Sequence, residues 1–200
     1  EDVLRKAAER GTMIHSICEL VDDMGITHDS DEAQGYKELK DDWGLRYECS
    51  EYLVSDNEHY ASCIDKVYRE NDTDFTLGDI KTTYVLDKES VRWQLSIYAY
   101  FFELQNPGCN AVRLIGIWLR GKNHEIVEVE RIPSEIVINL LKCDSEGRQF
   151  VNPYSISPVT LPGEYRKMER TIQEIVSQAK YWSDKKKEIT DGVMMAMVEA

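Results

Sequence analysis

The feature that most constrains this 200-residue chain is a short segment, residues 63–84, in which a polar break centred on Asp72 separates two runs with strand character. If the chain reverses at Asp72, residues equally far from it pair across an antiparallel hairpin. Asp65 and Asp79, seven residues before and after the break, then lie opposite one another with Cβ atoms about 4.5–5.5 Å apart. Lys81 projects from the same face, because side chains alternate along a strand. A β-bulge would shift this register.

Two carboxylates that face each other on a sheet repel unless something compensates their charge. A divalent cation does so, and ligation by oxygen alone suits Mg²⁺ or Mn²⁺. Ile80 would place a backbone carbonyl between the two carboxylates as a further oxygen ligand. Lys81 could hold an attacking water or offset the charge of a phosphate. The segment alone is equally consistent with a solvated hairpin in which Asp79 and Lys81 form a surface ion pair.

The first part of the chain, residues 2–24, repeats apolar side chains at three- and four-residue steps and is predicted to be a helix. Gly11, His15 and Glu19 are spaced four residues apart and therefore share one helix face. A glycine costs about 1 kcal/mol in a helix interior relative to alanine, so we expect another backbone or a ligand to approach Gly11 closely. His15 and Glu19 then suit the edge of a metal site, although an ordinary core or surface histidine explains His15 as well.

A second helix is predicted over residues 88–105, where Asn106-Pro107-Gly108 stops it. Gln94 and Tyr98 are four residues apart on this helix. They could offer an amide and a hydroxyl to a phosphate backbone. Ordinary polarity of a helix surface is the alternative.

The remaining segments complete an α/β pattern. We expect residues 25–44 to be a polar loop, with at most a short helix, and residues 133–200 to be a C-terminal helical extension. Gly121-Lys122-Asn123 marks a hairpin between the last two strands. The order of elements predicts one α/β domain with a mixed central sheet flanked by helices and a core over about residues 5–132. The strands are expected at 46–55, 60–69, 75–83, 111–120 and 124–132, and the helices of the extension at 133–143 and 162–182.

Charge and cysteine content narrow the function classes. The formal net charge is −13, but residues 22–58 hold twelve acidic and three basic residues, so the rest of the chain carries only −4. The composition therefore does not exclude nucleic acid as a partner.

None of the five cysteines forms a CxxC pair, which argues against a zinc knuckle, and we expect free thiols in a reducing, cytoplasmic compartment. No apolar stretch approaches the roughly 20 residues that span a bilayer, so no membrane association is expected.

Five motifs occur in a characteristic order. They are RGTMIH (10–15), a strand with Glu51, IDKV (64–67), GDIKTT (78–83) and QLSIY (94–98). With this order the chain resembles the RecB-like branch of the PD-(D/E)xK nuclease superfamily, in particular the lambda-exonuclease-like group of phage recombination exonucleases. The resemblance covers about residues 5–132 and implies the restriction-endonuclease-like αβββαβ core of that superfamily.

The resemblance also implies roles for individual residues. Asp65 and Asp79 would be catalytic and ligate a metal, and Lys81 would be the catalytic lysine. His15 and the carbonyl of Ile80 would be further metal ligands. The accessory residues would be Gln94 and Tyr98, near the scissile phosphate or DNA strand, and Glu19 and Glu51, in the outer metal shell or positioning water.

The activity so implied is a Mg²⁺- or Mn²⁺-dependent exonuclease that hydrolyses linear DNA in phage-type recombination or repair. Some relatives carry an iron–sulfur cluster held by three cysteines near the C-terminus. No cluster is expected here, because no cysteine follows Cys143. DNA is the implied partner. The resemblance also leaves open that a single-strand annealing protein is a second partner and that the chain forms a homo-oligomer. The alternatives are an endonuclease or CRISPR-adaptation type nuclease on the same fold, and a non-catalytic interaction module that works through its acidic segment.

Overall fold

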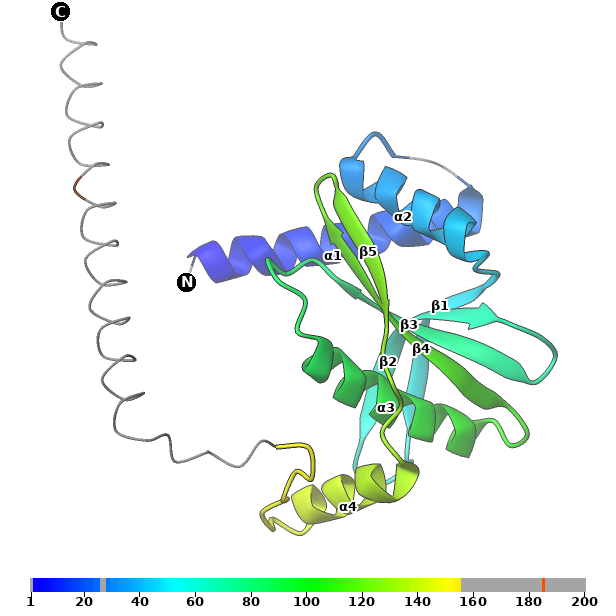
Figure 1. The fold of residues 1–200 in the computed structure, drawn as a ribbon, viewed down its shortest axis with the longest axis vertical. Coiled ribbons are helices and arrows are strands. Elements are labelled where there is room, and N and C mark those ends of the chain that lie inside the picture. The colour runs from blue at the N-terminus through cyan, green and yellow to red at the C-terminus, as the bar shows by residue number, and fades with distance from the viewer. Residues whose placement is uncertain (1, 26–27, 156–184, 186–200) are drawn as a thin grey trace, which may run out of the picture. The chain divides into compact units, whose positions relative to one another are not determined.

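The structure is a computed structural model that describes residues 2–25, 28–155 and 185 (Figure 1). The chain divides into two units, Glu1–Phe150 and Val151–Ala200, and the fold below is that of the first. The helix expected over 162–182 lies outside the described residues. Within the described part of the chain, no helix combines the length and apolar character needed to cross a membrane.

Nine elements follow one another in the first unit. Two helices come first, then three strands, a helix, two strands and a last helix. They are α1 (Asp2–Met24), α2 (Asp31–Trp43), β1 (Tyr47–Ser55), β2 (Ala61–Arg69), β3 (Asp74–Lys81), α3 (Lys88–Gln105), β4 (Asn110–Arg120), β5 (Asn123–Glu128) and α4 (Ser134–Ser145).

The five strands form one mixed sheet in the order β1-β2-β3-β4-β5. Neighbouring strands are antiparallel except β3 and β4, which run parallel because α3 carries the chain from one to the other. The predicted hairpin register is confirmed over four pairs of β2 and β3, from Lys66 with Gly78 to Arg69 with Phe75, all centred on Asp72. The second predicted hairpin is also confirmed, since Arg120 pairs with Asn123.

Helices cover both faces of the sheet (Figure 1). One buried cluster joins α1 and α2 to one face through residues such as Ile14, Tyr36 and Ile117. The other cluster joins α3 to the opposite face, with Leu95 and Leu77 at its centre. The mixed sheet flanked by helices agrees with the α/β fold predicted from the sequence.

The structure corrects the sequence analysis at three places. Residues 25–44 contain the 13-residue helix α2, whose N-cap Ser30 accepts a bond from the Ala33 amide. The strand expected over 124–132 ends at Glu128; the Val129 amide still donates to the Leu114 carbonyl of β4, and the chain then turns to α3, where the Ile132 amide donates to Ser96. The strand expected over 75–83 ends at Lys81, where side chains of β4 begin to bind the backbone carbonyls.

Candidate functional site

The centre of the candidate site lies where β2 and β3 separate. Lys66 and Gly78 form the last pair of the ladder on this side, so Asp65 and Asp79 stand one step beyond it. Here the Asp65 side chain enters the hydrogen bonding, because its Oδ2 accepts from the Ile80 amide at 2.7 Å. The two strands thus bring Asp65, Asp79 and Lys81 together at the point predicted from the sequence.

Asp79 is the most buried member of this group, with 1% of its side chain exposed. Its Oδ1 accepts a hydrogen bond from Gln94 Nε2 at 2.7 Å. Its Oδ2 lies 2.8 Å from Lys81 Nζ in an ion pair, yet it accepts no hydrogen bond of normal geometry from any described residue. Burial, and then the charge of Asp65, raise the pKa of Asp79 to about 6 although Lys81 opposes the shift.

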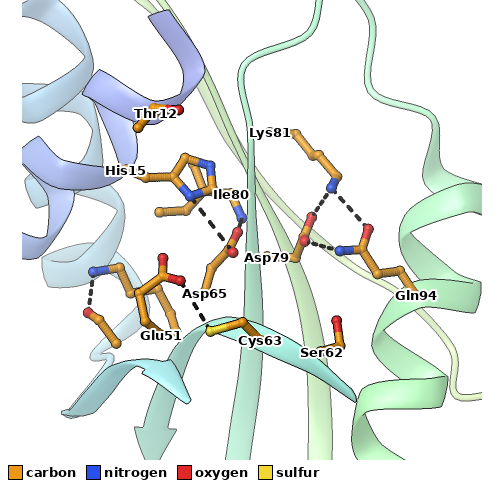
Figure 2. Close-up of polar contacts among 12 residues, drawn as sticks. Thr12, His15, Glu51, Ser62, Cys63, Asp65, Asp79, Ile80, Lys81 and Gln94 are labelled. Atoms are coloured by element: carbon orange, nitrogen blue, oxygen red, sulfur yellow. Dashed lines mark hydrogen bonds and ion pairs between the residues drawn. The ribbon is translucent and has the colours of Figure 1, made fainter. Parts of the chain in front are cut away.

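Lys81 is held in place by Gln94 of α3, which Figure 2 shows joined to both Lys81 and Asp79, and Gln94 is itself held by further polar side chains. Lys81 Nζ donates to Gln94 Oε1 at 3.0 Å, and Gln94 Nε2 donates to Tyr98 Oη at 2.9 Å. Tyr98 in turn accepts from Ser62 Oγ on β2 at 2.9 Å. Gln94 and Tyr98 therefore orient the lysine and the buried carboxylate, and their contact with a phosphate backbone stays a prediction.

His15 reaches the same point from α1. Its Nδ1 lies 3.7 Å from Asp65 Oδ1, and Figure 2 shows the ring pointing at this carboxylate. Glu51, on β1, completes a group in which one ligand atom each of His15, Glu51 and Asp65 lies within 4.8 Å of the others. Burial raises the pKa of Asp65 as well, with the His15 charge opposing it. These groups form a concentrated set of metal-ligand atoms around a carboxylate that is costly to ionise.

Glu51 has an unusual backbone. Its φ is +51°, a left-handed value for a residue that is not glycine, inside a strand. Such a conformation persists only where its surroundings hold it, and it is common at functional sites. The Cys63 thiol donates to Glu51 Oε2 at 3.1 Å, which is one of the contacts that hold the carboxylate.

A cavity of about 540 Å³ lies beside these groups. Glu19, predicted as an accessory residue, lines it together with His15 and Glu51. Thr12 and Ser16 line it too, and the sequence analysis missed them although they continue the polar face of α1. The expected approach of a backbone to Gly11 is not found among the described residues: an added Cβ would lie 3.5 Å from the side-chain Oγ1 of Thr82, an ordinary contact, and the approach of a ligand to Gly11 stays a prediction. The full lining is Gly11, Thr12, His15, Ser16, Glu19 and Glu51.

A buried ion pair between Lys66 and Asp22, which was not predicted from the sequence, lies next to Asp65 of the candidate site. Lys66, next to Asp65, is 2% exposed and donates to Asp22 Oδ2 and to Ser50 Oγ, both at 2.7 Å. Asp22, fully buried on α1, also pairs with Lys40 and accepts from Tyr36 Oη at 2.7 Å. Because every charge in this group has partners, the pair fixes α1 and α2 against β2.

The acidic segment 22–58 is largely occupied by contacts within the protein. Glu32 binds Arg10 and the Gly121 amide, which joins α1, α2 and the β4–β5 turn. Glu48 pairs with Arg69 across β1 and β2. Nine of the twelve acidic residues have a polar partner of this kind: 22, 23, 32, 38, 41, 48, 51, 56 and 58. The segment is therefore a folded part of the domain whose charges are mostly paired.

Comparison with known proteins adds little to this picture. No family model matches the chain, and no curated protein matches it. A solved structure described as the crystal structure of SSO0001 is similar, with 16% sequence identity and a TM-score of 0.46, over 81% of this chain and 73% of that one. A likeness at this level carries no argument about function, which therefore rests on the site itself.

Proposed function

We propose that the chain is a divalent-metal-dependent deoxyribonuclease of the PD-(D/E)xK type that hydrolyses linear DNA from its ends. The observation that carries the proposal is the state of Asp79. This carboxylate is almost completely buried beside the charge of Asp65, and its Oδ2 faces Lys81 Nζ at 2.8 Å. Such an arrangement is costly for a purely structural aspartate, because burial and the charge of Asp65 both oppose its ionisation and together outweigh the pairing with Lys81. It is favourable for a carboxylate that binds a cation.

The neighbouring residues fit a hard divalent cation. Asp65, Asp79 and Glu51 offer carboxylate oxygens and His15 offers an imidazole nitrogen, and three of these four groups already lie within 4.8 Å of one another. Oxygen-rich ligation of this kind suits Mg²⁺ or Mn²⁺. When bound, such a cation supplies Lewis acidity at a phosphate and lowers the pKa of a bound water.

Lys81 supplies the second element of the chemistry. Asp79 and Gln94 hold its ammonium group at fixed positions, while 28% of the side chain stays exposed to solvent. The ammonium can donate to an attacking water and offset charge on the phosphate. Addition of water to phosphorus breaks the bond to the 3′ oxygen. The products are a 5′ phosphate and a 3′ hydroxyl that takes up the proton.

The alternative of a non-catalytic acidic module is less well supported. Nine of the twelve acidic residues of the acidic segment have partners inside the domain, so fewer charges are left unneutralised for an acidic contact. The complete set of His15, Asp65, Asp79 and Lys81 is present at one place, whereas a site that has lost its activity would be expected to lack a member.

The test is incubation of the purified protein with end-labelled linear duplex and with covalently closed circular DNA, with and without Mg²⁺. We expect Mg²⁺-dependent shortening of the linear DNA and little change in the circle. Lys81→Ala should abolish cleavage, whereas Lys37→Ala, which removes an exposed lysine from α2, should cleave like the wild type. Cleavage by Lys81→Ala at the wild-type rate would refute the site. Cleavage of the closed circle would show that the protein is an endonuclease and would refute the proposed action from DNA ends.

A further inference from the structure

The loop that follows Lys81 presents a large aromatic ring to solvent. Tyr84 is 79% exposed, and its neighbour Val85 is 71% exposed. Exposed apolar side chains occur singly on most proteins and need no explanation by themselves. Here the exposed ring stands three residues beyond the lysine of the candidate site, on the segment that leads from β3 to α3.

The backbone that carries this ring is anchored. Trp118 Nε1 donates to the Thr83 carbonyl at 2.8 Å, and Arg120 donates to the Thr82 carbonyl at 3.3 Å. Thr83 Oγ1 closes the turn by donating to the Val85 carbonyl at 2.9 Å. A side chain on a segment held by two residues of β4 loses little further freedom when it binds a ligand.

The ring itself is also positioned. The Arg120 guanidinium lies 4.9 Å from the centre of the Tyr84 ring, in cation–π contact. Because the ring remains mostly exposed despite this contact, it still offers surface for a second planar group. An arginine and a tyrosine stacked in this way resemble the platforms on which proteins hold unpaired bases.

The segment that carries the platform approaches the cavity of the candidate site. Thr82, two residues before Tyr84, approaches Gly11 of α1, and Gly11 lines the same cavity as His15 and Glu51. Figure 1 shows the segment between β3 and α3 passing beside α1. A strand whose phosphate reaches Lys81 would therefore carry its neighbouring nucleotides past Tyr84.

We infer that Tyr84 and Arg120 form a stacking site for an unpaired base, so that the substrate engages the site as single-stranded DNA or as a frayed end. This inference rests on the proposed nuclease function. A base inside a duplex is already stacked on both sides and has no free face for a tyrosine, whereas an unpaired base offers its whole face to the ring.

The experiment measures binding of a fluorescent single-stranded oligonucleotide and of the matching duplex, with Ca²⁺ replacing Mg²⁺ to occupy the carboxylates. Tyr84→Ala should weaken single-strand binding about tenfold and duplex binding much less. Tyr84→Phe should bind like the wild type, because stacking needs the ring and not the hydroxyl. Val85→Ala is the matched control for an exposed apolar loop residue and should also bind like the wild type.

A spectroscopic measurement isolates stacking from other effects. With 2-aminopurine placed along the oligonucleotide, one position should be quenched by the wild type and by Tyr84→Phe but not by Tyr84→Ala. Unchanged binding and quenching in Tyr84→Ala would overturn the stacking site, and so would an equal loss on single strand and duplex. If the wild type still cleaves linear DNA in Mg²⁺, that failure leaves the nuclease proposal standing; if it neither binds nor cleaves DNA, both fall together.

Discussion

The burial of Asp79 predicts an unusual dependence of stability on pH. Without a bound cation, a carboxyl group whose pKa is about 6 in the fold, against 3.8 when exposed, resists ionisation in the native state. It therefore binds its proton more tightly in the folded than in the unfolded chain. Its contribution to stability is complete below pH 3.8 and is lost as the pH rises through about 6.

The size of the effect follows from the two pKa values. A difference of about two pH units corresponds to about 3 kcal/mol at 1.36 kcal/mol per unit. Asp79→Asn cannot ionise at this position and keeps an oxygen for the bond from Gln94. In EDTA, the stability of the variant relative to the wild type should thus rise by up to about 3 kcal/mol between pH 4 and pH 7.

Urea unfolding at a series of pH values measures this difference. With a denaturant slope of 1–3 kcal/mol/M, the midpoint of the variant should shift by about 1–3 M relative to the wild type across the range. Asp42→Asn makes the same atom exchange at an exposed position of α2 and should follow the wild type at every pH. A difference between Asp79→Asn and wild type that is constant with pH, or that falls as the pH rises, would refute the reasoning. Mg²⁺ at pH 7 should stabilise the wild type but not the variant.

Three further substitutions test the packing around the site. Gly11→Ala should stabilise the fold by up to about 1 kcal/mol, because the added methyl group makes only an ordinary contact and alanine favours the helix. The measurement is the melting temperature, which should rise; a lower melting temperature would contradict this prediction. Gly35→Ala should cost about 1–3 kcal/mol in urea unfolding, because its Cβ would lie 2.6 Å from His124 Nδ1, and an unchanged midpoint would show that the ring moves freely. Lys66→Ala should cost about 1.5–3 kcal/mol, because Asp22 loses one of its two cationic partners while Lys40 remains; a loss below 1 kcal/mol would rule out a supporting role for the pair.

The sequence predicted the hairpin of β2 and β3 well because two simple rules meet there. A polar turn sets the centre of the hairpin, and alternation along the strands then fixes every partner. The register from Lys66 to Arg69 follows those rules. The convergence of Asp65, Asp79 and Lys81 is a direct result of this local pairing.

Other parts of the site depend on contacts that no local pattern contains. The burial of Asp79 is produced by α3 and β4, which follow it in the chain, and the pairing of Asp22 with Lys66 joins residues 44 positions apart. The length of helix α2 was underestimated, since only a short helix was allowed within residues 25–44, because its sequence is mostly polar; the capping residues Ser30 and Gly44 were a usable signal. In these parts of the chain, tertiary contacts and not local propensity determine the structure.

Lys66 and Asp65 are neighbours on β2, so the residue that pairs with α1 through Asp22 stands directly beside the residue that faces His15 of the same helix. If α1 slid along the sheet by one residue, two charges would be left stranded in the interior, at a cost of several kcal/mol. The ion pair between Asp22 and Lys66 therefore fixes the position of α1, which carries His15, along the sheet, and this position does not depend on a bound cation. If the site binds a cation as proposed, binding would need little rearrangement of the scaffold, and its free energy would remain available for affinity.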